Sequence, residues 1–188
     1  MFIKRLFDIT VSLLVLLVLA IPMMVIALLI KLTSKGPVLY WSDRMGRDNA
    51  IFRMPKFRTM RIDTPTLATH LLGDPGNFLS PIGKFLRKSS LDELPQLISI
   101  LKGEMSFVGP RPALFNQDDL IELRTRKGIH HLTPGLTGWA QINGRDELPI
   151  RVKVEFDEFY LRHRSFTLDI LIIMQTIFKV VKGEGVTH

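Results

Sequence analysis

The sequence contains no cysteine. Disulfide bonds, thiolate metal sites and a thiol nucleophile are therefore excluded. No internal repeat or low-complexity tract is present, which argues against a repeat architecture. A glycine-rich stretch at residues 133–138 matches neither the P-loop nor the dinucleotide-binding fingerprint. No Ser-His-Asp order and no Asp-x-Asp metal motif appears, so two further common catalytic arrangements are missing.

Length and charge narrow the classes of protein. At 188 residues the chain is long enough for one domain with an additional segment. Its net charge of +7 favours acidic partners. Phosphates, anionic lipids and nucleic acids all remain candidates on this basis.

A long apolar segment near the N-terminus predicts a membrane helix. No charged residue occurs from Ile9 to Ile30, and this length is sufficient for a helix to cross a bilayer. A cleaved signal peptide does not fit, because the run is too long, no Ala-x-Ala site closes it and Lys31 follows at once.

Two features bear on how this helix lies in the membrane. Pro22 falls mid-segment, where it removes a backbone hydrogen bond and kinks a helix. Lysine or arginine occurs on both sides of the segment, so the positive-inside rule assigns no orientation. A spanning helix and a bent helix that enters and leaves the same leaflet both remain open, since transmembrane helices tolerate proline.

The rest of the chain predicts an α+β fold that is mainly helical with a small β-hairpin. The expected strands are residues 38–41 and 51–54, joined by a turn at 46–49. Residues 61–80 are typical of a surface loop. The expected helices cover residues 96–102, 116–127, 152–162 and 168–182.

One more helix is expected to start at Ser80 and Pro81, because serine caps helices and proline suits their first turn. Apolar and basic side chains then follow on different faces. Such an amphipathic helix lies either on the membrane surface, with its basic side towards headgroups, or on the protein core.

Asp92 and Glu93 are adjacent carboxylates beside a basic pair. Ser90-x-x-Glu93 matches a capping box, which would make both acids part of an ordinary helix start. Pro95 complicates that interpretation, because proline fits best at the first helical position. With either start the pair lies near a helix N-terminus, where phosphate also binds well. One carboxylate could then attack while the other orients or binds metal.

Several cations could meet a phosphate. Arg111 lies between two prolines, which suits a guanidinium that must bind phosphate oxygens in a fixed geometry, although an exposed turn explains it equally well. Lys56 and Arg58 follow the hairpin. Arg145 ends a loop that could approach a nucleotide.

These motifs together resemble the bacterial sugar transferases, the monotopic phosphoglycosyl transferases that begin glycan assembly on a polyprenol carrier. The resemblance covers nearly the whole chain. It rests on Lys4-Arg5-x-x-Asp8, Lys56-Phe57-Arg58-Thr59-Met60, Ser90-Leu91-Asp92-Glu93-Leu94-Pro95-Gln96-Leu97, Gly103 to Pro112, Pro134 to Gly138, Asn143-Gly144-Arg145, Asp157-x-x-Tyr160 and Asp169.

The resemblance implies an enzyme that moves a sugar 1-phosphate from a UDP-sugar to a polyprenol phosphate, such as undecaprenyl phosphate, with Mg²⁺. Asp92 would be the nucleophile, expelling UMP and holding the phosphosugar as an acyl phosphate. Glu93 would bind metal or position the phosphate, so that Asp92 and Glu93 are the expected metal residues. The implied substrate-binding residues are Lys56, Arg58, Arg87, Arg111, Arg145, Asp157 and Asp169. For the two aspartates, helix-end pairing is the alternative.

The resemblance also implies a membrane-embedded, re-entrant segment at 1–35 and a cytoplasmic catalytic domain at 36–188. The expected location is the cytoplasmic face of the bacterial inner membrane. The family's membrane break is a Ser-Pro pair, whereas this chain has Ile21-Pro22. The additional N-terminal membrane helices of larger relatives are absent from the sequence, so it is expected to be the minimal catalytic unit.

Two other functions are weighed against the transferase. A membrane-anchored basic adaptor could bind anionic lipid or nucleic acid, but the cations gather around carboxylates instead of forming a basic stripe. No nucleic acid is therefore expected as a partner, while a homo-oligomer stays open. A glycosyltransferase acting on polyprenol phosphate would release UDP, so the released nucleotide separates it from the transferase.

Overall fold

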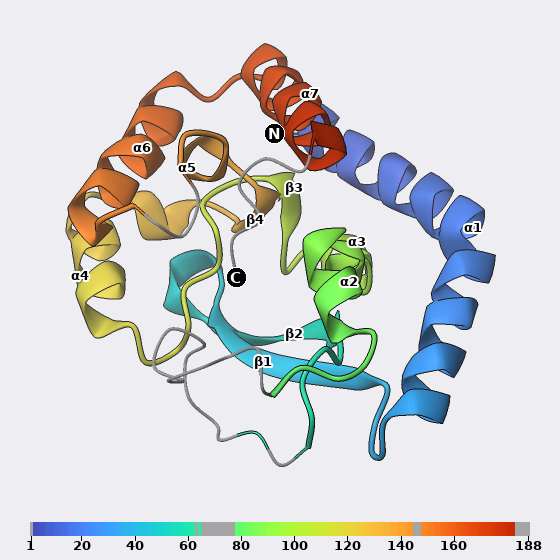
Figure 1. Ribbon diagram of the computed structural model, residues 1–188. Coiled ribbons are helices and arrows are strands. Elements are labelled where there is room, and N and C mark those ends of the chain that lie inside the picture. The colour runs from blue at the N-terminus through green and yellow to red at the C-terminus, as the bar shows by residue number, and fades with distance from the viewer. Residues whose placement is uncertain (1, 63, 65–77, 145–147, 183–188) are drawn as a thin grey trace.

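The computed structural model describes residues 2–62, 64, 78–144 and 148–182 (Figure 1). Its longer elements are helices α1 (Phe2–Thr33), α4 (Asp118–Arg126), α6 (Ile150–His163) and α7 (Phe166–Lys182), and strands β1 (Leu39–Met45) and β2 (Ile51–Phe57). The shorter ones are α2 (Gly83–Lys88), α3 (Gln96–Lys102), α5 (Trp139–Ile142), β3 (Ser106–Val108), β4 (Gly135–Thr137) and the 3-10 helices η1 (Arg47–Asn49), η4 (Leu91–Glu93) and η5 (Ile129–His131). The predicted α+β class is confirmed.

The predicted hairpin is present and longer than the sequence suggested. Strands β1 and β2 pair antiparallel from Leu39 opposite Phe57 to Met45 opposite Ile51. The turn between them puts Asp48 and Asn49 at positive φ, a region that asparagine and aspartate enter more readily than other side chains. Strands β3 and β4 form a separate parallel pair.

Two helix boundaries can be compared with the boundaries that the sequence predicted. Gly103 ends α3 at a φ of 89°, as its position predicted. The prediction that Ser80 caps α2 is wrong, because the helix begins only at Gly83 and the Ser80 hydroxyl has no hydrogen-bond partner. The Ser80 backbone instead bonds to Thr59 on one side and to Gly83 on the other, so the chain turns there before the helix starts.

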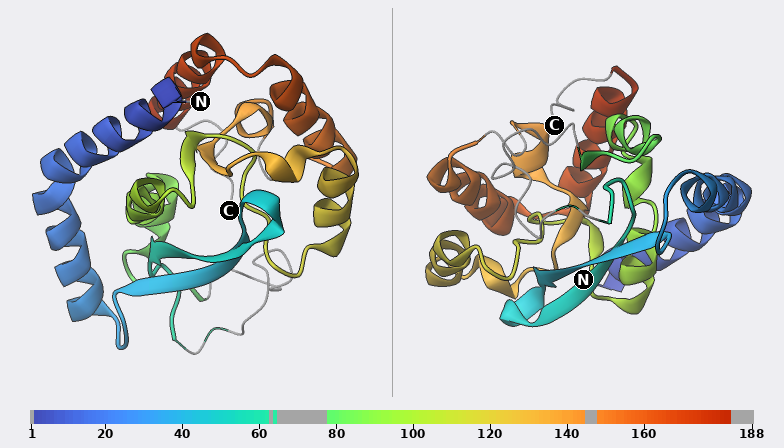
Figure 2. Two further views of the ribbon diagram at one scale, coloured as in Figure 1. Left: turned by 180° about the vertical axis from the view of Figure 1, so that it is seen from behind. Right: turned by 60° about the horizontal axis from the view of Figure 1, so that its bottom comes forward.

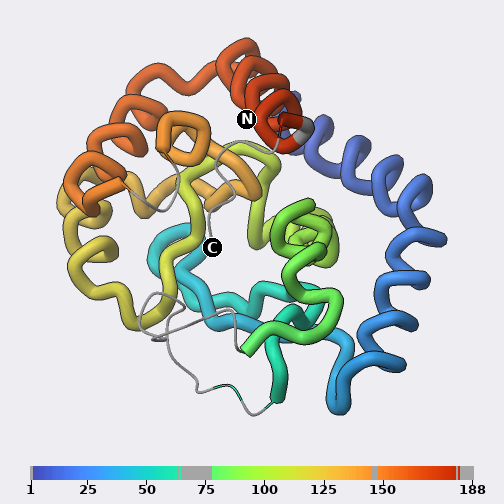
Figure 3. The backbone as a smooth tube through the Cα atoms, viewed as in Figure 1, coloured from blue at the N-terminus to red at the C-terminus, as the bar shows by residue number. Residues whose placement is uncertain are grey.

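Helix α1 is a single helix of 32 residues with Pro22 inside it. In the described part of the chain it is the one helix long and apolar enough to cross a membrane, by length and composition. Figures 1 and 3 show that it bends sharply near its middle. Proline clashes with the carbonyl four residues earlier, so a bend in this part of the helix has a direct cause.

Both arms of α1 lie against the globular part of the molecule, and the view from behind shows the same wrap (Figure 2). Near its start, Asp8 and Ser12 are buried, and α1 packs on α3 and β3. Near its end, Ile26 and Ile30 join a core cluster with Phe57 and Leu86. A straight helix of this length would extend about 48 Å and could not keep both ends on one small body.

Candidate active site

The Asp92–Glu93 pair lies in the short 3-10 helix η4, just before α3. Ser90 precedes it in the left-handed region with a φ of 56°, and its side chain makes no cap hydrogen bond. The capping-box interpretation is therefore wrong, and α3 begins after Pro95 instead. A non-glycine residue at positive φ is uncommon and is found disproportionately at functional sites.

Glu93 is held by two cations from distant parts of the chain. Its Oε1 accepts hydrogen bonds from Lys56 Nζ at 2.7 Å and from Arg111 Nη2 at 3.2 Å. Burial would raise the pKa of Glu93, but Lys56 and Arg111 outweigh it and bring the pKa well below its usual range. Glu93 therefore stays ionised, and its negative charge is balanced by Lys56 and Arg111.

Asp92 is in a different setting although it is the next residue. Its side chain is only 8% exposed, and no other described residue donates a hydrogen bond to its carboxylate. Burial raises the pKa of Asp92 to about 6, with Lys56 lowering it and Glu93 raising it further. A desolvated carboxylate that is still ionised near neutral pH is suited to attack an electrophile.

The other predicted cations that the structure describes differ in their contacts. Arg87 lies close enough to Asp92 for the two charges to interact, and its Nε donates to Thr59 Oγ1 at 3.0 Å. Arg58 is buried and donates to the Ser34 carbonyl just after α1 at 2.9 Å. Arg145 lies outside the described residues.

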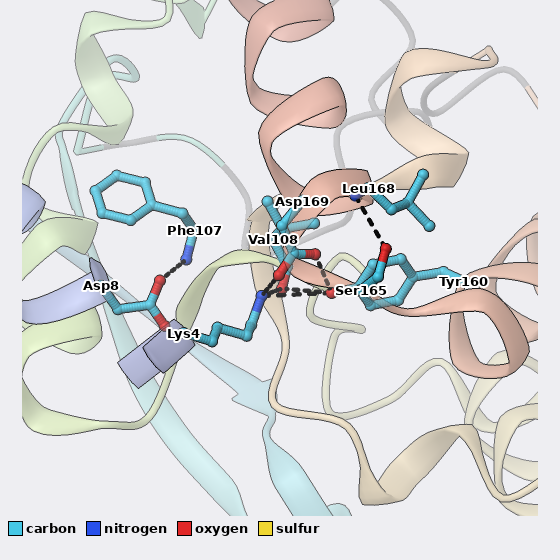
Figure 4. Close-up of polar contacts among 8 residues, drawn as sticks. All are labelled: Lys4, Asp8, Phe107, Val108, Tyr160, Ser165, Leu168 and Asp169. Atoms are coloured by element: carbon cyan, nitrogen blue, oxygen red, sulfur yellow. Dashed lines mark hydrogen bonds and ion pairs between the residues drawn. The ribbon is translucent and has the colours of Figure 1, made fainter. Parts of the chain in front are cut away.

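Asp157 and Asp169 are both engaged in ion pairs with other side chains, of which the Arg124–Asp157 pair is buried and the Lys4–Asp169 pair is partly buried. Arg124 holds Asp157 through Nη2 at 2.6 Å and Nε at 3.0 Å. Asp169 accepts from Lys4 Nζ at 2.6 Å and from the Tyr160 hydroxyl at 2.6 Å (Figure 4). Both carboxylates thus form the kind of pairing that was the alternative for them, and their role in substrate binding stays a prediction.

Sequence reasoning missed Arg124. This residue lies on α4 among exposed charges, and nothing in its neighbourhood marks it as buried. It is nonetheless only 8% exposed, and its Nη1 donates to the backbone carbonyl of Arg111 at 2.8 Å. The tertiary structure reveals the burial of Arg124, because α4 packs on α6 and brings Arg124 against Asp157.

The donor set at Asp92 suits Mg²⁺. No cluster of three or more potential metal ligands occurs among the described residues. Mg²⁺ does not require one, because it is usually bound by one or two carboxylates together with substrate phosphates and water. Asp92 supplies a hard oxygen of this kind, whereas Oε1 of Glu93 is already occupied by Lys56 and Arg111.

Comparison with known proteins identifies the family of this chain. Residues 1–183 match the bacterial sugar transferase family. The chain belongs to this family. It is therefore an enzyme of the transferase class, as the sequence predicted.

Other bacterial sugar transferases are among its relatives. An uncharacterized sugar transferase, EpsL, of Bacillus subtilis is 39% identical and is aligned over 99% of this chain and 91% of its own length. An undecaprenyl-phosphate glucose phosphotransferase of Komagataeibacter xylinus is 42% identical over 93% of this chain but only 35% of its own length. A UDP-glucose:undecaprenyl-phosphate glucose-1-phosphate transferase of Escherichia coli is 41% identical over 94% of this chain and 39% of its own. The chain thus spans less than half of these two longer sugar transferases.

Proposed function

We propose that the protein transfers a sugar 1-phosphate from a UDP-sugar to a polyprenol phosphate and releases UMP, with Asp92 as the nucleophile. The names of the related transferases support undecaprenyl phosphate as the acceptor. The observation that carries the proposal is the contrast within the acidic pair. Glu93 is neutralised by two cations, whereas Asp92 is buried without a hydrogen-bond donor from another described residue.

The reaction proceeds in two displacements. An oxygen of the Asp92 carboxylate attacks the phosphorus that carries the sugar, a new O–P bond forms, and the P–O bond to UMP breaks with its electron pair leaving on UMP. An oxygen of the polyprenol phosphate then attacks the same phosphorus and the Asp92 carboxylate leaves. The two half-reactions share one enzyme-bound acyl phosphate, so ping-pong kinetics are expected.

The cations around Asp92 and Glu93 would balance the negative charge of the bound substrate. Arg87 and Lys56 lie close enough to Asp92 to lower its pKa, and Lys56 and Arg111 bind Glu93. Such cations offset the charge of a diphosphate without rearrangement during the reaction. Mg²⁺ held by Asp92 and the diphosphate would supply further neutralisation of the phosphate oxygens.

The bent α1 supports a re-entrant position in the cytoplasmic face of the bacterial inner membrane. Both of its ends contact the same globular body, as expected if both lie on one side of the bilayer. Much of its surface remains apolar and exposed between them, including Leu17 and Ile21. A lipid environment would cover this surface.

The released nucleotide tests the proposed reaction. Full-length protein in lipid nanodiscs is incubated with undecaprenyl phosphate, Mg²⁺ and a panel of UDP-glucose, UDP-galactose and UDP-N-acetylgalactosamine labelled in the phosphate next to the sugar. UMP release and label on the protein that is lost when lipid phosphate is added are expected. Release of UDP would replace the proposal with a glycosyltransferase, and no nucleotide release would favour the basic adaptor.

Topology is testable directly because the chain has no cysteine. Phe2→Cys and Lys35→Cys, each made alone, place a thiol at either end of α1, and Glu122→Cys marks the catalytic body on α4. A membrane-impermeant maleimide should reach all three from the same side of inverted membrane vesicles. Opposite labelling of the two α1 ends would show a spanning helix.

A further inference from the structure

Carbonyl groups provide most of the contacts that hold residues 108–113 around Arg111, and the Gly109 N–H adds a hydrogen bond to the Thr137 carbonyl at 2.9 Å. Prolines on both sides of Arg111 have no N–H to donate. The carbonyls that accept hydrogen bonds here, with their donors, are Val108 (Lys4 and the Tyr160 hydroxyl), Pro110 (Gly135 N–H), Arg111 (Arg124), Pro112 (Arg44) and Ala113 (Met45 N–H). The path of this segment is therefore set by donors from several elements.

Arg124 occupies a special place among these donors. Its Nη1 binds the carbonyl of Arg111 itself, the residue whose side chain reaches Glu93. Its other two nitrogens are fixed by Asp157, which is only 1% exposed on α6. The guanidinium plane is rigid, so fixing two nitrogens fixes the direction of the third.

We infer that Arg124, locked by Asp157, is a positioning residue for phosphosugar transfer that aims the Arg111 side chain at the active-site carboxylates. The chain of contacts runs from Asp157 to Arg124, to the Arg111 backbone, and through the Arg111 side chain to Glu93. This inference rests on the proposed function, because Arg111 matters to the reaction only if a phosphate is bound beside Glu93.

A purely structural role for the ion pair predicts a different outcome. Buried ion pairs contribute little net stability, and replacing both partners by apolar side chains of similar volume is often neutral or stabilising. A variant that carries Arg124→Met and Asp157→Leu together removes both charges and the hydrogen bond to the Arg111 carbonyl. It tests positioning without leaving a buried charge unpaired.

For this apolar-pair variant we expect a melting temperature close to that of the unmodified protein and a fall in kcat of about 10- to 100-fold, with little change in KM for the UDP-sugar. The matched control is Arg126→Met, on the same helix but in an exposed pair with Glu122; it should leave kcat unchanged. Unaltered kcat in the apolar-pair variant would overturn the inference.

A double-mutant comparison shows whether the effect passes through Arg111. In an Arg111→Ala background, the apolar pair should cause no further loss of kcat. An equal fold-loss in both backgrounds would mean that the pair acts through general packing, which also overturns the inference. If the apolar-pair variant does not fold, Arg124→Lys takes its place, because a lysine retains the charge beside Asp157 but lacks the fork that spans both partners.

Hydrogen exchange separates failure of this inference from failure of the proposed function. If the unmodified protein turns over no UDP-sugar, the proposed function fails, and exchange of peptides covering residues 106–113 decides the structural part. The apolar-pair variant should speed exchange there at least several-fold and leave α3 unchanged. Unchanged exchange in residues 106–113 would reject the inference whatever the activity.

Discussion

Asp92 and Asp169 are two nearly buried aspartates in the same small protein, at 8% and 5% exposure. Asp169 is fully engaged, since Lys4 and Tyr160 both donate to it at 2.6 Å. Asp92 receives no hydrogen bond from another described residue, and burial raises its pKa to about 6. The Asp169 carboxylate is satisfied by two donors, whereas we propose that the Asp92 carboxylate reacts with the substrate.

This difference distinguishes a carboxylate that holds helices together from a carboxylate that is proposed to react with the substrate. Lys4 joins the start of α1 to Asp169 on α7 and also donates to the Val108 carbonyl of β3 at 2.9 Å (Figure 4). Burial and the hydrogen bond to Asp169 raise the pKa of Tyr160, so its hydroxyl stays a proton donor. A buried polar group with all its partners holds elements together, whereas one without them is a candidate for function.

The largest expected effect is on the activity of Asp92→Asn. UMP release should fall on the order of 10⁴-fold or more, because an amide cannot form the acyl phosphate. The free energy of unfolding at pH 8 should not decrease, since the substitution removes a desolvated charge. Activity and chemical denaturation are measured on the same nanodisc preparation. A stability loss that accounts for the lost activity would contradict the assignment.

Asp169→Asn should show the opposite pattern. It leaves Lys4 without its charge partner, and a loss of about 2–4 kcal/mol in unfolding free energy is expected. Activity per folded molecule should fall by much less than in Asp92→Asn. A large drop in kcat without a change in stability would place Asp169 in the active site and remove the distinction between the two aspartates.

Tyr160→Phe sharpens the same comparison by removing a single hydroxyl. The lost hydrogen bond to the charged Asp169 should cost about 2 kcal/mol of stability. Denaturant midpoints provide the measurement, with Tyr40→Phe as the control because Tyr40 is half exposed on β1. Equal effects of the two substitutions would show that the Tyr160 hydroxyl does not anchor α7.

The smallest effect expected is a pH dependence that belongs to Asp92. Below about pH 6 the protonated carboxylate cannot attack, so the rate should fall about tenfold per pH unit. Single-turnover UMP release without polyprenol phosphate isolates this step, because the acceptor phosphate would also titrate near pH 6. A rate independent of pH between 5 and 7 would contradict the raised pKa.

The free energy of unfolding should also depend on pH through Asp92. The folded pKa of Asp92 lies above its ordinary value of 3.8, so the ionised group costs stability above about pH 6 and the cost disappears as it is protonated. The stability advantage of Asp92→Asn should therefore shrink as pH falls from 7 to 5.

Local sequence patterns predicted local structure well where a single residue type has a strong backbone preference. The hairpin and the end of α3 at Gly103 followed from such signals. The capping box expected at Ser90 does not form, because it requires an extended backbone and Ser90 lies in the left-handed region. The cations that pair with Asp157 and Asp169 lie 33 and 165 residues away, beyond the reach of any local pattern.

Residue order by itself determined the hairpin, the longer helices, the apolar segment with its proline and the motifs that carry the family resemblance. These depend on backbone preferences and hydrophobicity, which act between near neighbours. Tertiary packing alone decided which acidic side chains became paired, and it raised the pKa of Asp92 by burial. The charge state of a carboxylate depends on its burial and on the cations beside it, and here those cations arrive from α1, β2 and α4 only once the chain has folded.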